Sequence, residues 1–169
     1  MPAMRKAARS LMLFWFIATS VLTIHYVFTD PQFDYRMLIV GSIIPVVGDV
    51  GGGWLSALNS VTFAVAVLVI VMAATIGRRA TRRILLGLPI GCLLHSVFGA
   101  SWNTTEVFWW PFAGVDLAGS QGMVFGRGAW SVVLELIGLT LTWWILRRHQ
   151  LTSIDRLRAW SRDGRLTFS

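Results

Sequence analysis

The sequence contains few charged residues and a single cysteine. Charged residues make up 14% of the 169 positions, whereas a soluble domain carries about 25%. The lone Cys92 excludes a disulfide framework and a cluster of thiolate metal ligands. The chain also lacks a glycine-rich phosphate loop with its lysine, a His-Glu-x-x-His motif and a nucleophile elbow. Nothing in the sequence therefore indicates a soluble enzyme of the classes that these motifs define.

Apolar residues fill most of the chain. They make up 55% of the sequence, and the mean hydropathy is +0.64. A straight transmembrane helix needs about 20 mostly apolar residues. Four runs approach that length: Leu11–Phe28, Trp54–Ile76, Ile84–Trp102 and Ala129–Leu146. We expect the first run to be a retained signal anchor, with a cleaved signal peptide as the alternative.

A fifth apolar run, Met37–Val47, is too short to cross a bilayer. It contains Pro45 and leads into Gly48–Gly53, where four of six residues are glycine. This composition suits irregular backbone, which a bilayer tolerates only where protein or a cavity covers it. The sequence therefore predicts an all-α integral membrane protein with four transmembrane helices plus a short re-entrant segment.

The arginines predict the orientation of these helices. The formal net charge is +7, and the positive residues flank the apolar runs, so they do not indicate a nucleic-acid partner. We expect the N-terminus, the loop Gly77–Arg83 and the C-terminal tail to be cytoplasmic, and Thr29–Arg36 and Asn103–Gly128 to lie outside. The predicted setting is the lipid of a bacterial plasma membrane. Residues 1–148 would form one transmembrane domain, and residues 149–169 a basic cytoplasmic tail, either an amphipathic helix on an anionic leaflet or a frayed segment.

Four polar residues lie in or beside the apolar runs, where an unpartnered ionisable group is costly. Asp49 either holds a metal or cation or caps the following helix, and Asn59 either contacts a ligand or bridges helices. His95 is a metal ligand, a proton carrier or a hydrogen-bonded structural residue. We predict that these three line one polar cavity open to the outer face. Glu135 would lie near its wall and accept a hydrogen bond from His95 or pair with Arg127.

Small residues recur every four positions in the apolar run Ile84–Trp102. Gly87, Gly91, His95 and Gly99 share one helical face, and small residues at this spacing let two helices approach closely. We therefore predict a tight helix contact on this face. Its neighbour would be another helix, a membrane-protein partner or a second copy of the chain.

Several short motifs follow one another in a recognisable order. Ile-Ile-Pro-Val-Val-Gly-Asp occupies residues 43–49, Asn-Ser-Val-Thr residues 59–62, Leu-His residues 94–95 and Phe-Trp-Trp-Pro-Phe residues 108–112. This order resembles the YdjM-like family of membrane-bound metal-dependent hydrolases over roughly residues 38–112. That family has an acidic pair after a proline, His-Ser at the next span, a histidine four residues before an aspartate, and then Trp-Pro-Phe.

The resemblance implies a role for individual residues. Asp49 matches the acidic loop, Ser60 the serine of His-Ser, and His95 the later histidine. The acid, the histidine and the aspartate that complete the family's pattern are replaced by Gly48, Asn59 and Gly99. Because carboxylate and imidazole supply the affinity for a hard divalent metal, Asp49, Asn59 and His95 would hold it weakly or not at all.

Two functions from different classes follow. The first is a member of this hydrolase family that has become weak or catalytically silent. If it is active, Asp49, His95 and Glu135 would hold the attacking water against a membrane-embedded or outer-face substrate. The second is a small structural or accessory subunit that packs against a larger membrane protein through the glycine face. A proton or small-solute pathway ranks below both.

Overall fold

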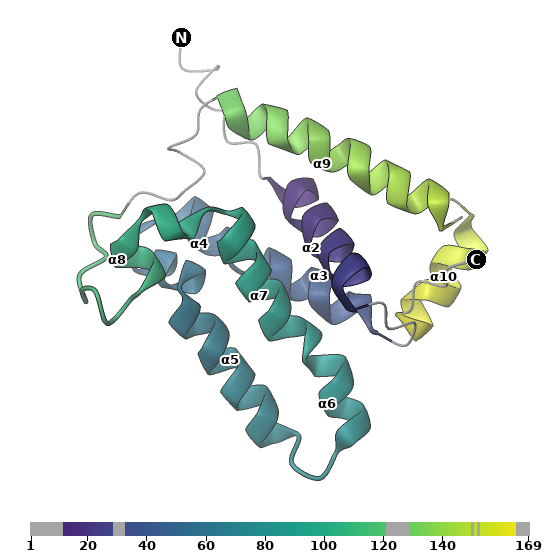
Figure 1. Cartoon of the computed structure of the whole chain (residues 1–169), viewed down its shortest axis with the longest axis horizontal. Helices are drawn as coiled ribbons and strands as arrows, with labels where there is room; N and C mark the ends of the chain where they lie inside the picture. The colour runs from purple at the N-terminus through teal and green to yellow at the C-terminus, as the bar shows by residue number, and fades with distance from the viewer. Residues whose placement is uncertain (1–11, 29–32, 121–128, 150, 152, 165–169) are drawn as a thin grey trace.

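The structure is a computed structural model that describes residues 12–28, 33–120, 129–149, 151 and 153–164. Within these ranges it contains helices and no strand, so the all-α part of the prediction is confirmed (Figure 1). The α-helices are α2 (Leu13–Phe28), α3 (Tyr35–Ile43), α4 (Val46–Gly51), α5 (Val61–Ala74), α6 (Arg79–Leu85), α7 (Gly87–Phe98), α8 (Thr105–Phe108), α9 (Ala129–Arg148) and α10 (Ile154–Asp163). Two 3₁₀ helices, η1 (Gly53–Asn59) and η2 (Ser101–Asn103), complete the set.

The prediction of four transmembrane helices is wrong. Among the described residues, one helix is long and apolar enough to cross a membrane, the stretch Trp130–Arg148 of α9. The count rises to two only if η1 and α5, which meet at a bend of 62°, are taken as one span. Helix α2 has only 16 residues and α7 only 12.

The apolar runs overestimate helix length because polar and small residues interrupt them. Ser60 caps α5, since its side-chain oxygen accepts a hydrogen bond from the backbone amide of Phe63 at 3.0 Å. This cap begins a new helix inside the run that was expected to form one span. The run Ile84–Trp102 is also divided, because α6 ends at Leu85 and α7 extends only from Gly87 to Phe98, here without a side-chain cap.

The segment predicted to be re-entrant forms a central helix instead. Helix α3 ends at Ile43, and α4 begins at Val46 directly after Pro45. Pro45 has no backbone amide hydrogen, so it cannot continue the hydrogen-bond ladder of α3. Tyr35 and Leu38 of α3 are buried in the main hydrophobic core. Length alone could not reveal this, because nine residues suffice for a helix that packs between others.

The glycine face of α7 packs against α3 of the same chain. A Cβ atom at Gly91 would lie 2.7 Å from the backbone nitrogen of Ser42, and one at Gly87 would lie 2.8 Å from that of Leu38. Real Cβ atoms do not approach backbone so closely. The predicted tight contact is therefore confirmed at Gly87 and Gly91, and α3 fills this part of the face. At Gly99 the nearest side chain beyond the local turn is that of Phe16.

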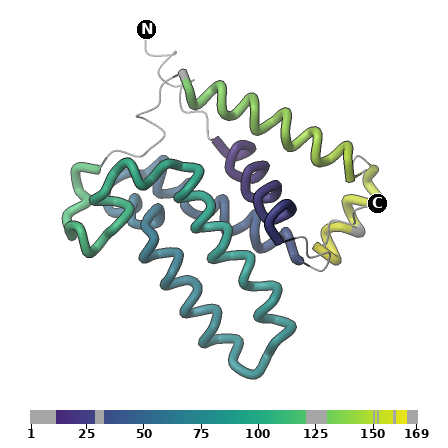
Figure 2. The backbone as a smooth tube through the Cα atoms, viewed as in Figure 1, coloured from purple at the N-terminus to yellow at the C-terminus, as the bar shows by residue number. Residues whose placement is uncertain are grey.

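Helices α2 and α9 lie side by side and run in the same direction (Figure 2). Near their starts, the backbone amides of Phe14 and Trp15 each lie 3.3 Å from a carboxylate oxygen of Glu135. Near their ends, the rings of His25 and His149 have centroids 6.0 Å apart. The start of α2 and the end of α9 are therefore at opposite ends of this helix pair.

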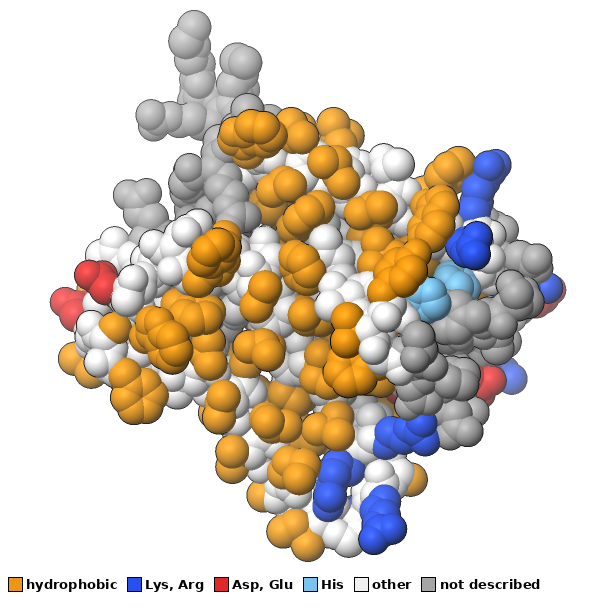
Figure 3. Space-filling model, viewed as in Figure 1, with side chains coloured by type: hydrophobic (Ala, Val, Ile, Leu, Met, Phe, Trp, Pro, Cys, Tyr) orange, Lys and Arg blue, Asp and Glu red, His pale blue; other side chains and the backbone are white. Residues whose placement is uncertain are grey.

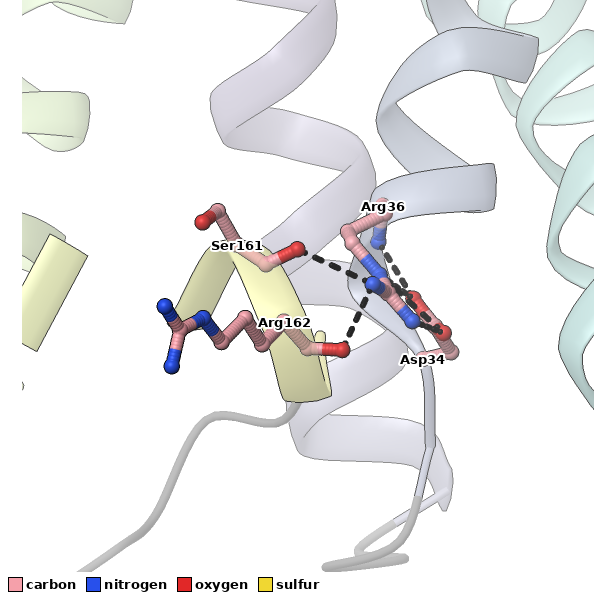
Figure 4. A network of polar contacts seen from close by, with 4 residues as sticks. All are labelled: Asp34, Arg36, Ser161 and Arg162. Atoms are coloured by element: carbon pink, nitrogen blue, oxygen red, sulfur yellow. Dashed lines mark hydrogen bonds and ion pairs between the residues drawn. The ribbon is translucent and has the colours of Figure 1, made fainter. Parts of the chain in front are cut away.

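Hydrogen bonds connect the C-terminal end of helix α10 to the start of α3 (Figure 4). The Arg36 guanidinium donates to the backbone oxygens of Ser161 at 3.0 Å and Arg162 at 2.8 Å. It also pairs with Asp34, and this hydrogen bond raises the pKa of Arg36. The backbone amide of Tyr35 donates to the oxygen of Gly164 at 2.9 Å. The predicted topology is wrong here, because it placed Thr29–Arg36 and the tail on opposite sides of a membrane.

Large apolar side chains remain exposed on several helices, among them α5 and α9. On α5, Val69 is 61% and Ile70 is 65% exposed, and on α9, Trp130 is 70% and Leu136 is 59% exposed. Hydrophobic side chains spread across the face shown in Figure 3, with Lys and Arg gathered at its lower and right edges. Large exposed apolar patches are typical of surfaces that contact lipid or protein.

Candidate functional site

Three of the predicted site residues form one hydrogen-bonded cluster. The Oδ2 atom of Asp49 lies 2.9 Å from Nε2 of His95, and its Oδ1 atom accepts from Nδ2 of Asn59 at 3.0 Å. These residues come from α4, η1 and α7. Their exposed fractions are 2% for Asp49, 1% for Asn59 and 0% for His95. The predicted convergence is confirmed, but the cluster is packed and buried rather than lining an open cavity.

The end of α3 supplies the fourth member of the cluster. The Nδ1 atom of His95 lies 2.7 Å from the backbone oxygen of Ser42. Ser42 lies in the last turn of α3, where helix carbonyls have no partner within the helix. Pro45, three residues after Ser42, cannot continue α3 and so leaves this carbonyl for His95.

These neighbours determine how many protons the cluster holds. A carbonyl oxygen can only accept, so Nδ1 of His95 carries a hydrogen. The Nε2 atom faces a carboxylate oxygen, which also accepts when ionised. One further proton therefore lies between His95 and Asp49, either as an imidazolium–carboxylate pair or as a neutral pair. In both forms the pair carries no net charge, which lowers the cost of burying it.

An aromatic ring covers the histidine. The ring centroid of Phe16 lies 3.7 Å from that of His95, with the two planes inclined by 31°. Phe16 belongs to α2 and is itself buried. Together with its contacts to Ser42 and Asp49, this ring places His95 at the meeting point of α2, α3, α4 and α7. The contacts of His95 therefore link these four helices.

Only the nitrogen of the Asn59 side-chain amide is hydrogen-bonded. Its nitrogen donates to Asp49, but its Oδ1 atom is buried and has no hydrogen-bond partner among the described residues. Since a buried, unpaired amide oxygen costs about 1–3 kcal/mol, this atom is a candidate contact for a bound species. The side chain of Ser60, the next residue, caps α5 instead of joining the cluster.

Gly48 leaves no room for a second acid beside Asp49. A Cβ atom at this position would lie 3.0 Å from Nδ2 of Asn59 and 3.2 Å from the backbone carbonyl carbon of Leu55. Gly48 is buried within α4, although glycine is a poor helix former. The close approach of η1 explains why glycine is present in this helix.

Glu135 lies apart from the cluster in a different role. Its carboxylate accepts hydrogen bonds from the backbone amides of Phe14 and Trp15, at the first turn of α2. Those amides have no partner within the helix, and a negative charge there is favourable. The sequence led us to expect a hydrogen bond from His95 to Glu135, but within the described part of the chain His95 bonds to Ser42 and Asp49 instead. The alternative pairing with Arg127 lies outside the described residues.

The donor set does not suit a divalent metal. Among the described residues there is no group of three or more His, Cys, Asp or Glu side chains that could hold a metal ion. Asp49 and His95 are the only strong ligands of the cluster, and both already bond to protein. A hard cation usually needs more oxygen or imidazole ligands than this.

Cys92 adds no ligand, although it lies on the same helix as His95. Its side chain is fully buried, and burial raises the pKa of the thiol to about 11. The neutral thiol is a poor nucleophile and a poor metal ligand. Cys92 therefore packs as a small apolar residue.

Sequence reasoning missed two members of the site, the Ser42 carbonyl and the Phe16 ring. A backbone carbonyl carries no residue signature, and Phe16 is one aromatic residue among many in its apolar run. Pro45 was the one available signal, because it predicts that the preceding helix ends and frees its carbonyls.

Comparisons with protein families, with curated proteins and with solved structures find no match to this chain.

Proposed function

We propose that the chain is a membrane-anchored, catalytically silent relative of the YdjM-like hydrolases, in which the Asp49–His95 pair joins helices instead of holding a metal. One observation carries this proposal. Both carboxylate oxygens of Asp49 are hydrogen-bonded to protein side chains, His95 and Asn59, and all three residues are at most 2% exposed. A substrate could not reach them in this arrangement.

The orientation of His95 supports descent from a metal site. Metal-binding histidines usually donate one ring N–H to a carbonyl or carboxylate and present the other nitrogen to the metal. His95 donates from Nδ1 to Ser42 and presents Nε2 to Asp49. The orienting contact of a ligand histidine is therefore present, while the further ligands are not.

The replaced positions support the loss of the metal. Gly48 has no room for an acid, and Asn59 directs an amide N–H, which is a donor, at the carboxylate. An amide donor stabilises the carboxylate directly, as a metal would in an active relative. Gly48 and Asn59 thus fit a site whose polar side chains connect helices instead of binding a metal.

Metal analysis of the detergent-purified protein tests this proposal. We expect much less than one equivalent of Zn²⁺, Mn²⁺ or Mg²⁺ per chain, and no difference between the wild type and His95→Gln. Stoichiometric metal in the wild type that His95→Gln removes would support an intact hydrolase site instead. The unpaired Oδ1 atom of Asn59 is the observation that favours this second outcome.

The anchoring part of the proposal rests on α9. This helix is long and apolar enough to cross a membrane, and its last turn carries Arg147 and Arg148. Their guanidinium carbons lie 4.3 Å and 5.7 Å from the ring centroids of Trp143 and Trp144. Tryptophan followed by arginine is typical of the cytoplasmic edge of a bilayer. We propose that this end of α9 faces the cytoplasm of a bacterial cell.

Cysteine labelling tests the orientation. Ser153→Cys, just after α9, should react with an impermeant maleimide only after the cells are permeabilised. The buried Cys92 should remain unlabelled and so provides the background control. Labelling of Ser153→Cys in intact cells would place this end of α9 outside.

A second candidate, an accessory subunit, is favoured by exposed aromatic residues at η2 and α8. Trp102, Trp109 and Phe112 are 60%, 51% and 84% exposed. A dye on Phe112→Cys separates the two settings, because brominated lipid should quench it at a bilayer interface. If the dye is not quenched, this surface does not lie at a bilayer interface. That result would favour contact with a protein partner, as expected for an accessory subunit.

A further inference from the structure

Three helices of the chain end towards the same side of the molecule. Helix α6 turns back from the end of α5, where the Arg82 guanidinium donates to the backbone oxygen of Thr75 at 3.1 Å. Helix α7 then continues from α6 towards the start of α2, where Phe16 covers His95. Since α2 and α9 run in the same direction (Figure 2), α2, α5 and α9 all end towards one side (Figure 1).

This side collects arginines from three places in the sequence, and we call it the basic end. Residues 78–83 hold four arginines, residues 147–148 hold two, and α10 holds three. Three aspartates lie among them in the described part of the chain, and one of these, Asp34, is already paired with Arg36. Figure 3 shows the resulting positive charge along two adjoining edges of the molecule. A surface of this charge attracts anionic partners.

Helix α10 presents its arginines outward. Its apolar residues Leu157 and Trp160 line the cavity against α2, α3 and α9, and Trp160 packs on the main hydrophobic core. Arg158 and Arg162 are four residues apart and share another face with Ile154, which is 68% exposed. The three exposed arginines of α10 make no side-chain hydrogen bond or ion pair within the described part of the chain. The apolar side of α10 is therefore occupied, while its arginines remain available to an external partner.

The position of α10 is tied to the end of α9. Five residues separate Arg148 from Ile154, a connection of at most about 20 Å. The other end of α10 is held at the start of α3 by Arg36 (Figure 4). Trp143 and Trp144 at the end of α9 are typical of the edge of a bilayer. When α9 crosses a membrane, α10 therefore lies at the level of the lipid headgroups.

We propose that the basic end binds the headgroups of anionic phospholipids on the membrane surface that the end of α9 reaches. This inference rests on the membrane anchoring proposed above. Guanidinium groups form paired hydrogen bonds with phosphate, and an anionic leaflet attracts basic residues next to a transmembrane helix. Because the apolar side of α10 is occupied by the chain itself, the contact is electrostatic and weakens in salt. Insertion of an amphipathic helix through its apolar face would depend much less on salt.

Electron paramagnetic resonance of spin-labelled lipids provides the test. The full chain is reconstituted in phosphatidylcholine vesicles with a trace of spin-labelled phosphatidylglycerol, which is anionic, or of spin-labelled phosphatidylcholine, which has no net charge. The motionally restricted fraction of the label gives the association constant of each lipid. At low salt we expect phosphatidylglycerol to associate about fivefold more tightly than phosphatidylcholine. In about 1 M NaCl the difference should fall below about twofold, because the charges are screened.

Variants locate the contact at the basic end. A change of all three arginines of α10 to Gln should reduce the preference for phosphatidylglycerol at low salt to about twofold. The same three positions changed to Lys keep their charge and should retain most of the preference. Glu106→Gln is the control, because Glu106 is exposed in α8, at the opposite end of the molecule, and its loss should leave the preference unchanged. Circular dichroism melts establish that each variant is folded.

Flotation of the vesicles separates this inference from the proposed anchoring. A protein that does not float with phosphatidylcholine vesicles would overturn the anchoring and this inference together. A protein that floats but associates equally with both lipids at low salt would overturn this inference alone. The same holds for a preference that about 1 M NaCl leaves unchanged, or that the folded Gln variant keeps in full.

Discussion

The Nε2 atom of His95 lies 2.9 Å from the Oδ2 atom of Asp49, and this contact joins α4 to α7 across 46 positions of the chain. Both residues are almost fully buried. Removing one member of such a pair leaves the other buried without compensation, which costs about 3–5 kcal/mol. The pair is therefore expected to dominate the stability of the region around α4.

Asp49→Ala should lower the free energy of unfolding by about 3–5 kcal/mol, because His95 and Asn59 then lose the carboxyl group to which both are hydrogen-bonded. Glu106→Ala provides a matched control, since Glu106 is an exposed carboxylate and its loss should change stability by less than about 0.5 kcal/mol. Denaturant unfolding of both variants measures the difference. Equal stability of the two variants would show that the cluster contributes nothing.

Gly91→Ala should also destabilise the protein, although alanine favours helices by about 1 kcal/mol over glycine. The added Cβ would lie 2.7 Å from the Ser42 nitrogen, so α3 and α7 must separate. Overpacking against backbone costs about 1–3 kcal/mol. Gly119→Ala, where nothing lies within 4 Å of the added atom, is the control and should melt like the wild type. A Gly91→Ala protein that is more stable than wild type would refute the tight contact.

Glu135→Ala should cost about 0.5–2 kcal/mol, the usual loss for a helix cap, because the amides of Phe14 and Trp15 lose their acceptor. Glu135→Gln keeps an acceptor oxygen and should recover part of this loss. The ring-nitrogen resonances of His95 should hardly move in either variant. A large change in the His95 resonances would instead indicate that Glu135 interacts with the cluster of Asp49, Asn59 and His95.

The sequence predicted the site better than the fold. Asp49, Asn59 and His95 could be grouped because each is a polar residue with few ways to be satisfied among apolar neighbours. The partner of Glu135 could not be predicted, since a backbone amide of α2 has no signature in the sequence. Hydrophobic runs predicted helical structure but neither the number of helices nor their ends, because Ser60 and Pro45 divide runs that composition presents as continuous.

Of two close helix contacts, only one could be predicted from the sequence. The repeat of Gly87 and Gly91 predicted a contact, and α3 provides it. Gly138 of α9 makes a similar approach to α2, where a Cβ atom would lie 2.6 Å from the carbonyl carbon of Phe14. A single glycine has no periodicity, so this second contact gave no signal.

Arg36→Ala should release α10 from α3, because two hydrogen bonds to its last turn are lost. Trypsin should then cleave α10, which contains Arg156, Arg158 and Arg162, about tenfold faster, as expected when about 1.4 kcal/mol of local stability is removed. The exposed Arg79→Ala is the control, and its digestion of α10 should match the wild type. Unchanged cleavage in Arg36→Ala would mean that other contacts hold the helix.

The melting temperature of the purified protein with and without divalent metal tests the central claim most directly. A metal that binds only the folded chain at 100 times its dissociation constant would add about 2.7 kcal/mol and raise the melting temperature by about 5–10 °C. We predict that Zn²⁺, Mn²⁺ and a chelator each change it by less than about 1 °C. A rise of several degrees with metal that is lost in His95→Gln would contradict the account, because Asp49 and His95 would then form a working metal site.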